Sequence, residues 1–235
     1  MVAFVNKNII TAPILQWSVG LCALVTLYLA FCFGSASIYA VATEKNIERW
    51  VKHPQDVTPN MINETKQTIL EAIDYHSSHP HYYNLLGKTL EWEAYLSTTE
   101  DQIGILQQAK KAYLKSASLR QNWPDTWADL LSVETQLQGE NINLYFDNAN
   151  QYGPFIPTVN SKIAQVGLEN WQQFTPQRRS IIIEHIARAL THPKSQGEMY
   201  RYLQSSGLLK FACAAIIYNP RGYDGKVNLC KKVLK

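Results

Sequence analysis

The stretch "YNLLGKTLEWEAY", residues 83–95, carries the pattern that decides the fold. Tyr83 is followed by Leu86 and Gly87, three and four positions later. This spacing is typical of the first helix of a tetratricopeptide unit, in which two paired helices approach closely at the glycine. The stretch therefore predicts one half of a helical hairpin, and the other half should follow within the next 30 or so residues.

The second half of the pattern lies in "AKKAYLKSASL". Ala109 and Tyr113 reproduce the alanine and the aromatic residue that the second helix of such a unit carries. Trp127 and Leu130 then repeat the aromatic-x2-Leu spacing and open a further unit. The sequence therefore predicts successive helical hairpins rather than an isolated pair.

Two features depart from a regular repeat. The interval from Gly87 to Ala109 is about ten residues longer than the repeat requires. We place the extra residues at positions 95–104, either as longer helices or as a raised loop. Pro124 is the second irregularity, because it falls close to the start of the next unit.

The remaining chain also has the periodicity of amphipathic helices, bounded by proline and glycine. Thr58-Pro59 and Thr175-Pro176 each combine a capping hydroxyl with a proline at the first helical position, which indicates a helix start. His53-Pro54 and His192-Pro193 indicate helix ends, because the residue before a proline is pushed out of the helical region. The chain contains no alternating strand pattern, so we predict an all-α fold.

A long run without charge precedes the repeats. Between Lys7 and Glu44 there is no Asp, Glu, Lys or Arg. About 20 apolar helical residues cross a bilayer, and Trp17 and Tyr39 lie near the ends of the run, where aromatic rings favour the interface. We therefore predict a transmembrane helix over residues 14–40.

We expect this helix to be an uncleaved signal-anchor. Ala40 to Ala42 resembles the small-x-small site of a cleaved signal peptide, which remains the alternative, although the apolar run is about twice as long as a signal-peptide core. Lys7 is the only early positive side chain and favours a cytoplasmic N-terminus. The domain would then lie on the other side of the membrane.

These predictions divide the chain into four parts. Residues 1–13 form a short cytoplasmic N-terminus and residues 14–40 the transmembrane helix. Residues 41–218 form the tetratricopeptide-like helical domain, and residues 219–235 a basic C-terminal tail that folds back through Cys230.

The four cysteines fall into two groups. Cys22 and Cys32 lie inside the apolar run, where cysteine acts as a small apolar residue. Cys213 and Cys230 are the pair in the rest of the chain, and in an oxidising compartment they would form a disulfide. The alternative is two unpaired thiols.

Composition and motifs argue against an enzyme and against nucleic-acid binding. The formal net charge is +3 and the basic residues are scattered, which gives no nucleic-acid footprint. The sequence has no nucleophile elbow, no phosphate-binding glycine loop and no zinc-protease helix. We therefore predict no catalytic residues, no cofactor and no metal ligands.

Two groups of side chains, three histidines and two adjacent arginines, could in principle bind a metal or an anion. His76, His79 and His81 could converge on a metal, but the repeat spacing places them at a turn between helices, and we favour the turn. Arg178 and Arg179 could bind an anion, although the stems of such arginines more often cover apolar surface. The predicted binding feature is instead the concave face that stacked hairpins form, which suits a protein partner.

The order of these features resembles the VpsP-like polysaccharide biosynthesis family. An N-terminal anchor is followed by the tetratricopeptide-like "AKKAYLKSASLRQNWPDTWADL", by "NQYGPFIPTVNSKIAQVGLENWQQFTPQRRSIII" and by a C-terminal cysteine pair. The elements that carry the resemblance most clearly are Gly153-Pro154-Phe155, Pro157, Gly167-Leu168, Trp171 and Arg178.

The resemblance implies an accessory protein of bacterial exopolysaccharide synthesis or export. Such a protein would sit in the inner membrane with its domain in the periplasm, and would contact other proteins of a surface or biofilm polysaccharide complex. An adaptor of another envelope pathway, such as cytochrome assembly or secretion, is the alternative. A glycan hydrolase or lyase is the third hypothesis.

Overall fold

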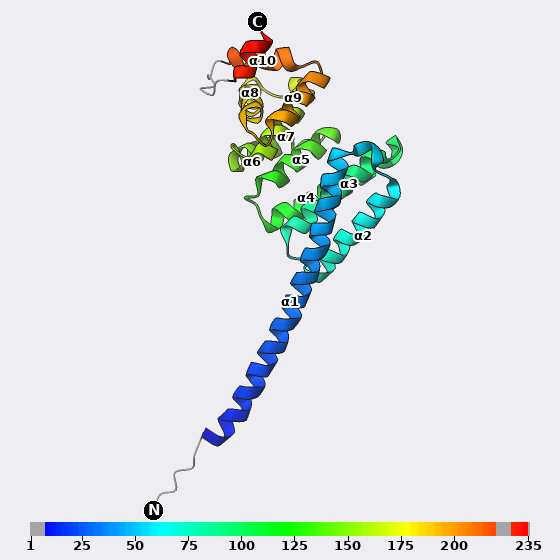
Figure 1. Cartoon of the computed structure of the whole chain (residues 1–235), viewed down its shortest axis with the longest axis vertical. Helices are drawn as coiled ribbons and strands as arrows, with labels where there is room; N and C mark the ends of the chain where they lie inside the picture. Colours follow the sequence, from blue (N-terminus) through cyan, green and yellow to red (C-terminus); the bar gives the residue numbers. More distant parts are fainter. Residues whose placement is uncertain (1–7, 220–226, 235) are drawn as a thin grey trace, which may run out of the picture.

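The computed structural model describes residues 8–219 and 227–234 and shows an all-α protein (Figure 1). The helices in chain order are α1 (Asn8–Lys52), η1 (Pro54–Asp56), α2 (Pro59–Tyr75), α3 (Pro80–Leu96), α4 (Thr99–Leu119), α5 (Pro124–Gln136), α6 (Ile142–Tyr152), α7 (Pro157–Glu169), η2 (Trp171–Gln173), α8 (Pro176–Thr191), α9 (Gln196–Ser205), α10 (Leu209–Ile217) and α11 (Asn228–Val233). No strand occurs in these described ranges.

Consecutive helices pack in pairs. The C-terminal half of α1 packs on α2, α3 on α4, α5 on α6, and α7 on α8, while α9, α10 and α11 close the C-terminal end. Figure 1 shows the pairs following one another along the long axis, with the two chain ends at opposite ends of the molecule. This is the hairpin-repeat arrangement that the sequence predicts.

Proline determines where five of the α-helices begin. α2, α3, α5, α7 and α8 each start with this residue, whose fixed φ and missing N–H suit the first helical position. The Thr58 and Thr175 hydroxyls accept hydrogen bonds from the backbone N–H groups of Met61 and Arg178, each at 3.4 Å. Both predicted cap-plus-proline starts are thus confirmed. Pro124 is a regular helix start as well, rather than the irregularity expected there.

The ten extra residues of the first complete hairpin lengthen its helices. α3 ends at Leu96 and α4 begins at Thr99, so only Ser97 and Thr98 lie between them. The structure thus selects the longer helices over the raised loop for residues 95–104. A long hairpin buries more apolar surface between its two helices, which supports the neighbours on either side.

A glycine lies at the closest approach of this hairpin. A methyl group on Gly87 of α3 would collide with the ring of Tyr113 on α4, which is fully buried. Gly167 of α7 has the same role, because a methyl group there would collide with Ile182 of α8. The Val166-Gly167 sequence thus corresponds structurally to the Leu86-Gly87 sequence of the earlier unit.

The other signature residues differ in burial. Tyr83 and Leu86 are half-buried, whereas their neighbours Tyr82 and Leu85 are buried in the core. The Tyr83 hydroxyl donates to the Ser77 carbonyl at 2.9 Å. Ala109, Tyr113 and Leu130 are fully buried. Trp127 is half-buried, and its indole N–H donates to the Gln121 carbonyl.

α1 is one continuous helix of 45 residues. Within the described part of the chain, only the segment Leu15–Lys52 is long and apolar enough to cross a membrane. Its first part is exposed, while Cys32, Ala36 and Ala40 are buried against the domain. The helix has no break at the expected boundary between residues 40 and 41, and the Ala40–Ala42 site lies within it.

A disulfide links the C-terminal helices α10 and α11 to each other, and a hydrogen bond links Asn219 to α8. Cys213 of α10 and Cys230 of α11 form a disulfide with an S–S distance of 2.10 Å. The Ser180 hydroxyl of α8 donates to Asn219 Oδ1 at 2.8 Å. Residues 227–233, expected as part of a basic tail, are therefore held against the helical domain.

Candidate ligand-binding cleft

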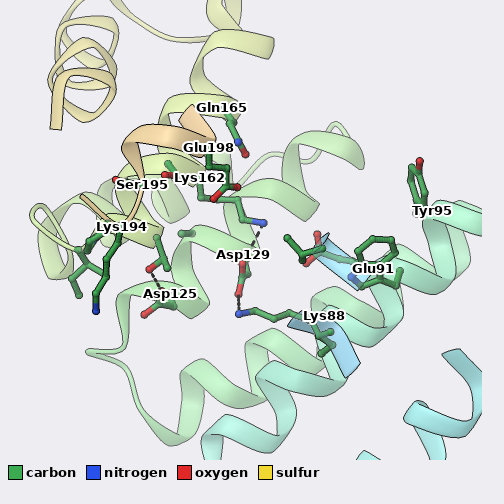
Figure 2. Close-up of a pocket in the computed structure, with 18 of the residues that line it drawn as sticks. Lys88, Glu91, Tyr95, Asp125, Asp129, Lys162, Gln165, Lys194, Ser195 and Glu198 are labelled. Atoms are coloured by element: carbon green, nitrogen blue, oxygen red, sulfur yellow. Dashed lines mark hydrogen bonds and ion pairs between the residues drawn. The ribbon is translucent and has the colours of Figure 1, made fainter. Parts of the chain in front are cut away.

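A cleft of about 900 Å³ opens on one face of the stacked hairpins (Figure 2). Its walls come mainly from the first helix of each hairpin, that is α1, α3, α5 and α7, and from the α8–α9 turn and α9. In a stack of hairpins the first helices form one layer and the second helices the other. The cleft is therefore the concave side of the repeat.

A buried carboxylate lies at the centre of the cleft. The Asp129 side chain on α5 is 6% exposed and lies between two ammonium groups, Lys88 Nζ of α3 at 3.6 Å and Lys162 Nζ of α7 at 3.4 Å. Asn84 donates to its Oδ2 atom at 3.1 Å. Figure 2 shows both lysines pointing at this carboxylate from opposite walls. Three consecutive hairpins therefore meet at one ion cluster.

The surroundings keep this cluster charged. Burial alone would raise the pKa of Asp129, but the charges of Lys88 and Lys162 and the hydrogen bond from Asn84 hold it below its usual range. Burial would lower the pKa of Lys162, yet the nearby Glu91 and Asp129 carboxylates outweigh it and raise the pKa. The pair thus remains ionised at neutral pH.

The pKa of Glu91 is shifted in the opposite direction to that of Asp129. Its carboxyl group is half-buried and accepts a hydrogen bond from the Tyr113 hydroxyl below it. Burial raises the pKa of Glu91, although Lys162 opposes the shift. Glu93, two positions along α3, points elsewhere and binds Lys66 of α2 at 2.8 Å. The two glutamates therefore have different partners on different sides of α3.

Aromatic residues form one wall. Trp92 and Tyr95 of α3 line the cleft with ring centroids 5.7 Å apart, and Tyr95 is 67% exposed. On the α7 side, Ser161 is buried and lines the cleft, and its hydroxyl has no hydrogen-bond partner among the described residues. The cleft thus offers an aromatic surface, a buried polar group and paired charges.

The ion cluster was not predicted from the sequence, although the sequence contains a pattern that indicates it. Each of the three helices carries two polar residues one turn apart, and these pairs are Asn84 and Lys88, Asp125 and Asp129, and Thr158 and Lys162. Residues four apart lie on the same helix face, so each pair marks the side that turns toward the cleft. In α3 and α5 the pairs adjoin Gly87 and Leu130 of the repeat signature, which are buried.

His76 and His79 flank the α2–α3 turn, and His81 lies in the first turn of α3. The ring centroids of His76 and His79 are 5.4 Å apart, and those of His79 and His81 are 6.4 Å apart. His79 stacks on Tyr82, and His81 packs against Trp123. In the residues that the structure describes, no three His, Cys, Asp or Glu side chains gather as metal ligands.

The two adjacent arginines are engaged within the protein. Arg178 forms a two-pronged ion pair with Asp147, with N–O distances of 3.1 and 2.7 Å. Arg179 donates to the Trp171 carbonyl at 2.9 Å and its guanidinium lies over the Trp171 ring. Both side chains serve the packing of α6, η2 and α8.

Comparison with known proteins adds no assignment. No protein-family model matches the chain, and a search of curated proteins finds no significant match. The geometry of the cleft and of α1 therefore carries the functional argument.

Proposed function

We propose that this protein is a membrane-anchored helical-repeat adaptor whose cleft binds an extended segment of a partner protein. The observation that carries the proposal is the cleft of about 900 Å³ on the concave side of four helical hairpins. Stacked hairpins commonly use this side to bind peptide segments. The protein would then act by docking, without catalytic residues or a cofactor of its own.

The chemistry of the cleft suits a polypeptide. Its lining contains three lysines and four acidic residues, so the charges nearly balance and favour neither a polyanion nor a polycation. A peptide backbone needs both donors and acceptors, which the Lys88–Asp129–Lys162 cluster and Ser161 supply. Trp92 and Tyr95 offer apolar contact for a side chain.

The apolar first part of α1 supports an anchor. It is exposed over residues 15–31 and is long enough to span a bilayer, so burial in lipid would remove this apolar surface from water. We propose a single-pass protein of the bacterial inner membrane with its domain in the periplasm. The orientation rests on Lys7, and the disulfide is consistent with an oxidising compartment.

The resemblance in sequence gives the proposal its pathway. We propose that the partners are proteins of an exopolysaccharide synthesis or export complex, as in the VpsP-like family. An adaptor in cytochrome assembly or secretion would use the same cleft with other partners. A glycan hydrolase or lyase would instead release new chain ends when the purified protein is incubated with the native polysaccharide.

Site-specific cross-linking tests this function. A photoreactive phenylalanine analogue replaces Tyr95, which is exposed in the cleft, and in a matched control it replaces Tyr218, which is exposed outside it. We expect irradiated cells to give adducts with polysaccharide polymerase or export proteins from position 95 and not from position 218. Absence of adducts at position 95, or identical adducts at both positions, would contradict docking in the cleft.

A further inference from the structure

We propose that the base of the helical domain, formed by the α2–α3 turn, rests in the phospholipid headgroup layer. The membrane is the one that α1 crosses, so this inference rests on the anchor of the proposed function. It adds a second interaction surface, distinct from the cleft, and a lipid partner for the histidine turn.

The membrane-spanning part of α1 ends near Phe31. Glu71 and Asp74 are exposed near the end of α2, the helix that packs on α1, so this part of the domain cannot enter the hydrocarbon. The helix from Asn8 to Phe31 is roughly 36 Å long at 1.5 Å per residue. A hydrocarbon core of about 30 Å takes up nearly all of that length.

The end of α2 contacts α1. The rings of Phe31 and Tyr75 lie edge to face with centroids 6.2 Å apart, and those of Phe33 and His76 are 4.3 Å apart. The α2–α3 turn is therefore level with Phe31 and Phe33 (Figure 1). Because each headgroup layer is about 5–7 Å thick, this turn falls within it.

The tip of the α2–α3 turn is polar. Ser77 and Ser78 are exposed at the tip of the turn, and their hydroxyl groups can donate to lipid phosphates. The neighbouring α4–α5 turn lies farther from the lipid, because His81, which packs on Trp123, is 3.9 Å from Glu44, eleven residues beyond Phe33 on α1.

The continuity of the apolar surface supports the same placement. Ile38, five residues beyond Phe33 on α1, which packs on α2, is 71% exposed. The exposed apolar surface of the span thus continues onto the base of the domain without a charged residue in between. No length of chain is left to hold the domain away from the lipid.

Spin labels on the full-length chain test the placement. In a background with Cys22 and Cys32 replaced by alanine, single labels are attached at Ser18→Cys in the span, Ser78→Cys at the base and Ser205→Cys on α9. All three serines are exposed, so the variants are matched. The protein is reconstituted in phosphatidylcholine and phosphatidylglycerol vesicles that contain a small fraction of a nickel-chelating lipid.

We expect oxygen to relax the Ser18 label strongly and the headgroup nickel to relax the Ser78 label several-fold more than the Ser205 label. If Ser18 is in lipid but Ser78 and Ser205 respond equally to nickel, the base does not touch the headgroups and the inference fails alone. If Ser18 is outside the lipid, the anchor of the proposed function fails together with the inference.

Discussion

Glycine at one position sets how closely α3 and α4 pack. A side chain at Gly87 would meet the ring of Tyr113, which is fully buried and whose hydroxyl is fixed by Glu91. Because the ring is fully buried and its hydroxyl is hydrogen-bonded, a methyl group at Gly87 would have to displace it or the helix. The signature glycine is thus a packing requirement and not a turn.

Replacing this glycine tests the requirement. We expect Gly87→Ala to lower the free energy of unfolding by about 1–3 kcal/mol, because overpacking forces the two helices apart. Gly104→Ala is the matched control on α4, since a methyl group there meets open space and alanine favours the helix by up to about 1 kcal/mol. Urea unfolding in detergent measures both, and equal effects would contradict the close approach.

A buried histidine makes the stability depend on pH. His185 of α8 is fully buried, with Nδ1 2.6 Å from Asn160 Oδ1 and Nε2 2.9 Å from Asn150 Oδ1. Burial, and secondarily the charge of Arg188, lowers the pKa of His185 to about 3. A neutral ring has one donor and one acceptor, so one of the two amides must turn its NH₂ group toward it.

The sign of the pH effect follows from that pKa. In the unfolded chain the His185 ring takes up a proton near pH 6.5, whereas in the folded chain it stays neutral until about pH 3. The contribution of His185 to the free energy of unfolding is therefore complete above pH 6.5 and decreases as the pH falls toward 3. We expect the free energy of unfolding to fall by about 2 kcal/mol from this residue between pH 7.5 and pH 5. The His185→Gln variant, which cannot titrate, should lack that part of the pH dependence in paired unfolding experiments. Parallel curves for the two proteins would contradict it.

At the scale of the element, α1 serves two environments. Its first part exposes apolar side chains, and its second part packs on α2 and α3. Trp50 is 1% exposed and its ring lies 5.8 Å from that of Trp92, which lines the cleft. One helix therefore connects the apolar segment to the wall of the cleft.

Removing that contact should loosen the helix from the domain. We expect Trp50→Ala to destabilise the domain by about 3–5 kcal/mol, because it leaves a large cavity between α1 and α3. The neighbouring Val51 is 61% exposed, and Val51→Ala should change stability by no more than about 0.5 kcal/mol. Limited proteolysis and thermal unfolding measure the difference. A small effect of Trp50→Ala would show that α1 is not part of the folded unit.

At the scale of the molecule, a membrane anchor formed by the first part of the continuous α1, as proposed above, would hold the cleft at a set height above the lipid. The helix is roughly 68 Å long at 1.5 Å per residue, and its second part packs along the domain. A partner that docks in the cleft would thus be held at a defined distance from the lipid. This geometry suits an adaptor between membrane-bound proteins.

The proposed topology makes a redox prediction. A disulfide between Cys213 and Cys230 persists in an oxidising compartment, whereas cytosolic reductants keep thiols reduced. In a variant with Cys22 and Cys32 replaced by serine, we expect a mass-tagging maleimide added to acid-quenched, denatured cells to label the protein only after reduction. Labelling without reductant would place the domain in the cytoplasm.

The sequence by itself determined the helical class and several helix boundaries. Thr58-Pro59 and Thr175-Pro176 act through the backbone of their own turn, so their effect does not depend on distant residues. The Gly87 and Tyr113 spacing likewise identified a close helix pair. The charge-free run marked the one described helix long and apolar enough to span a membrane.

Only the tertiary structure decided which polar residues meet. Lys88, Asp129 and Lys162 belong to three helices, and their convergence depends on how each helix is rotated against its neighbour. That rotation is set by contacts between buried side chains, such as Gly167 on Ile182. It also explains why Tyr82 is more deeply buried than the signature residue Tyr83. The spacing of residues along one helix shows which of them share a face of that helix. The packing between helices decides which residues of a neighbouring helix that face contacts.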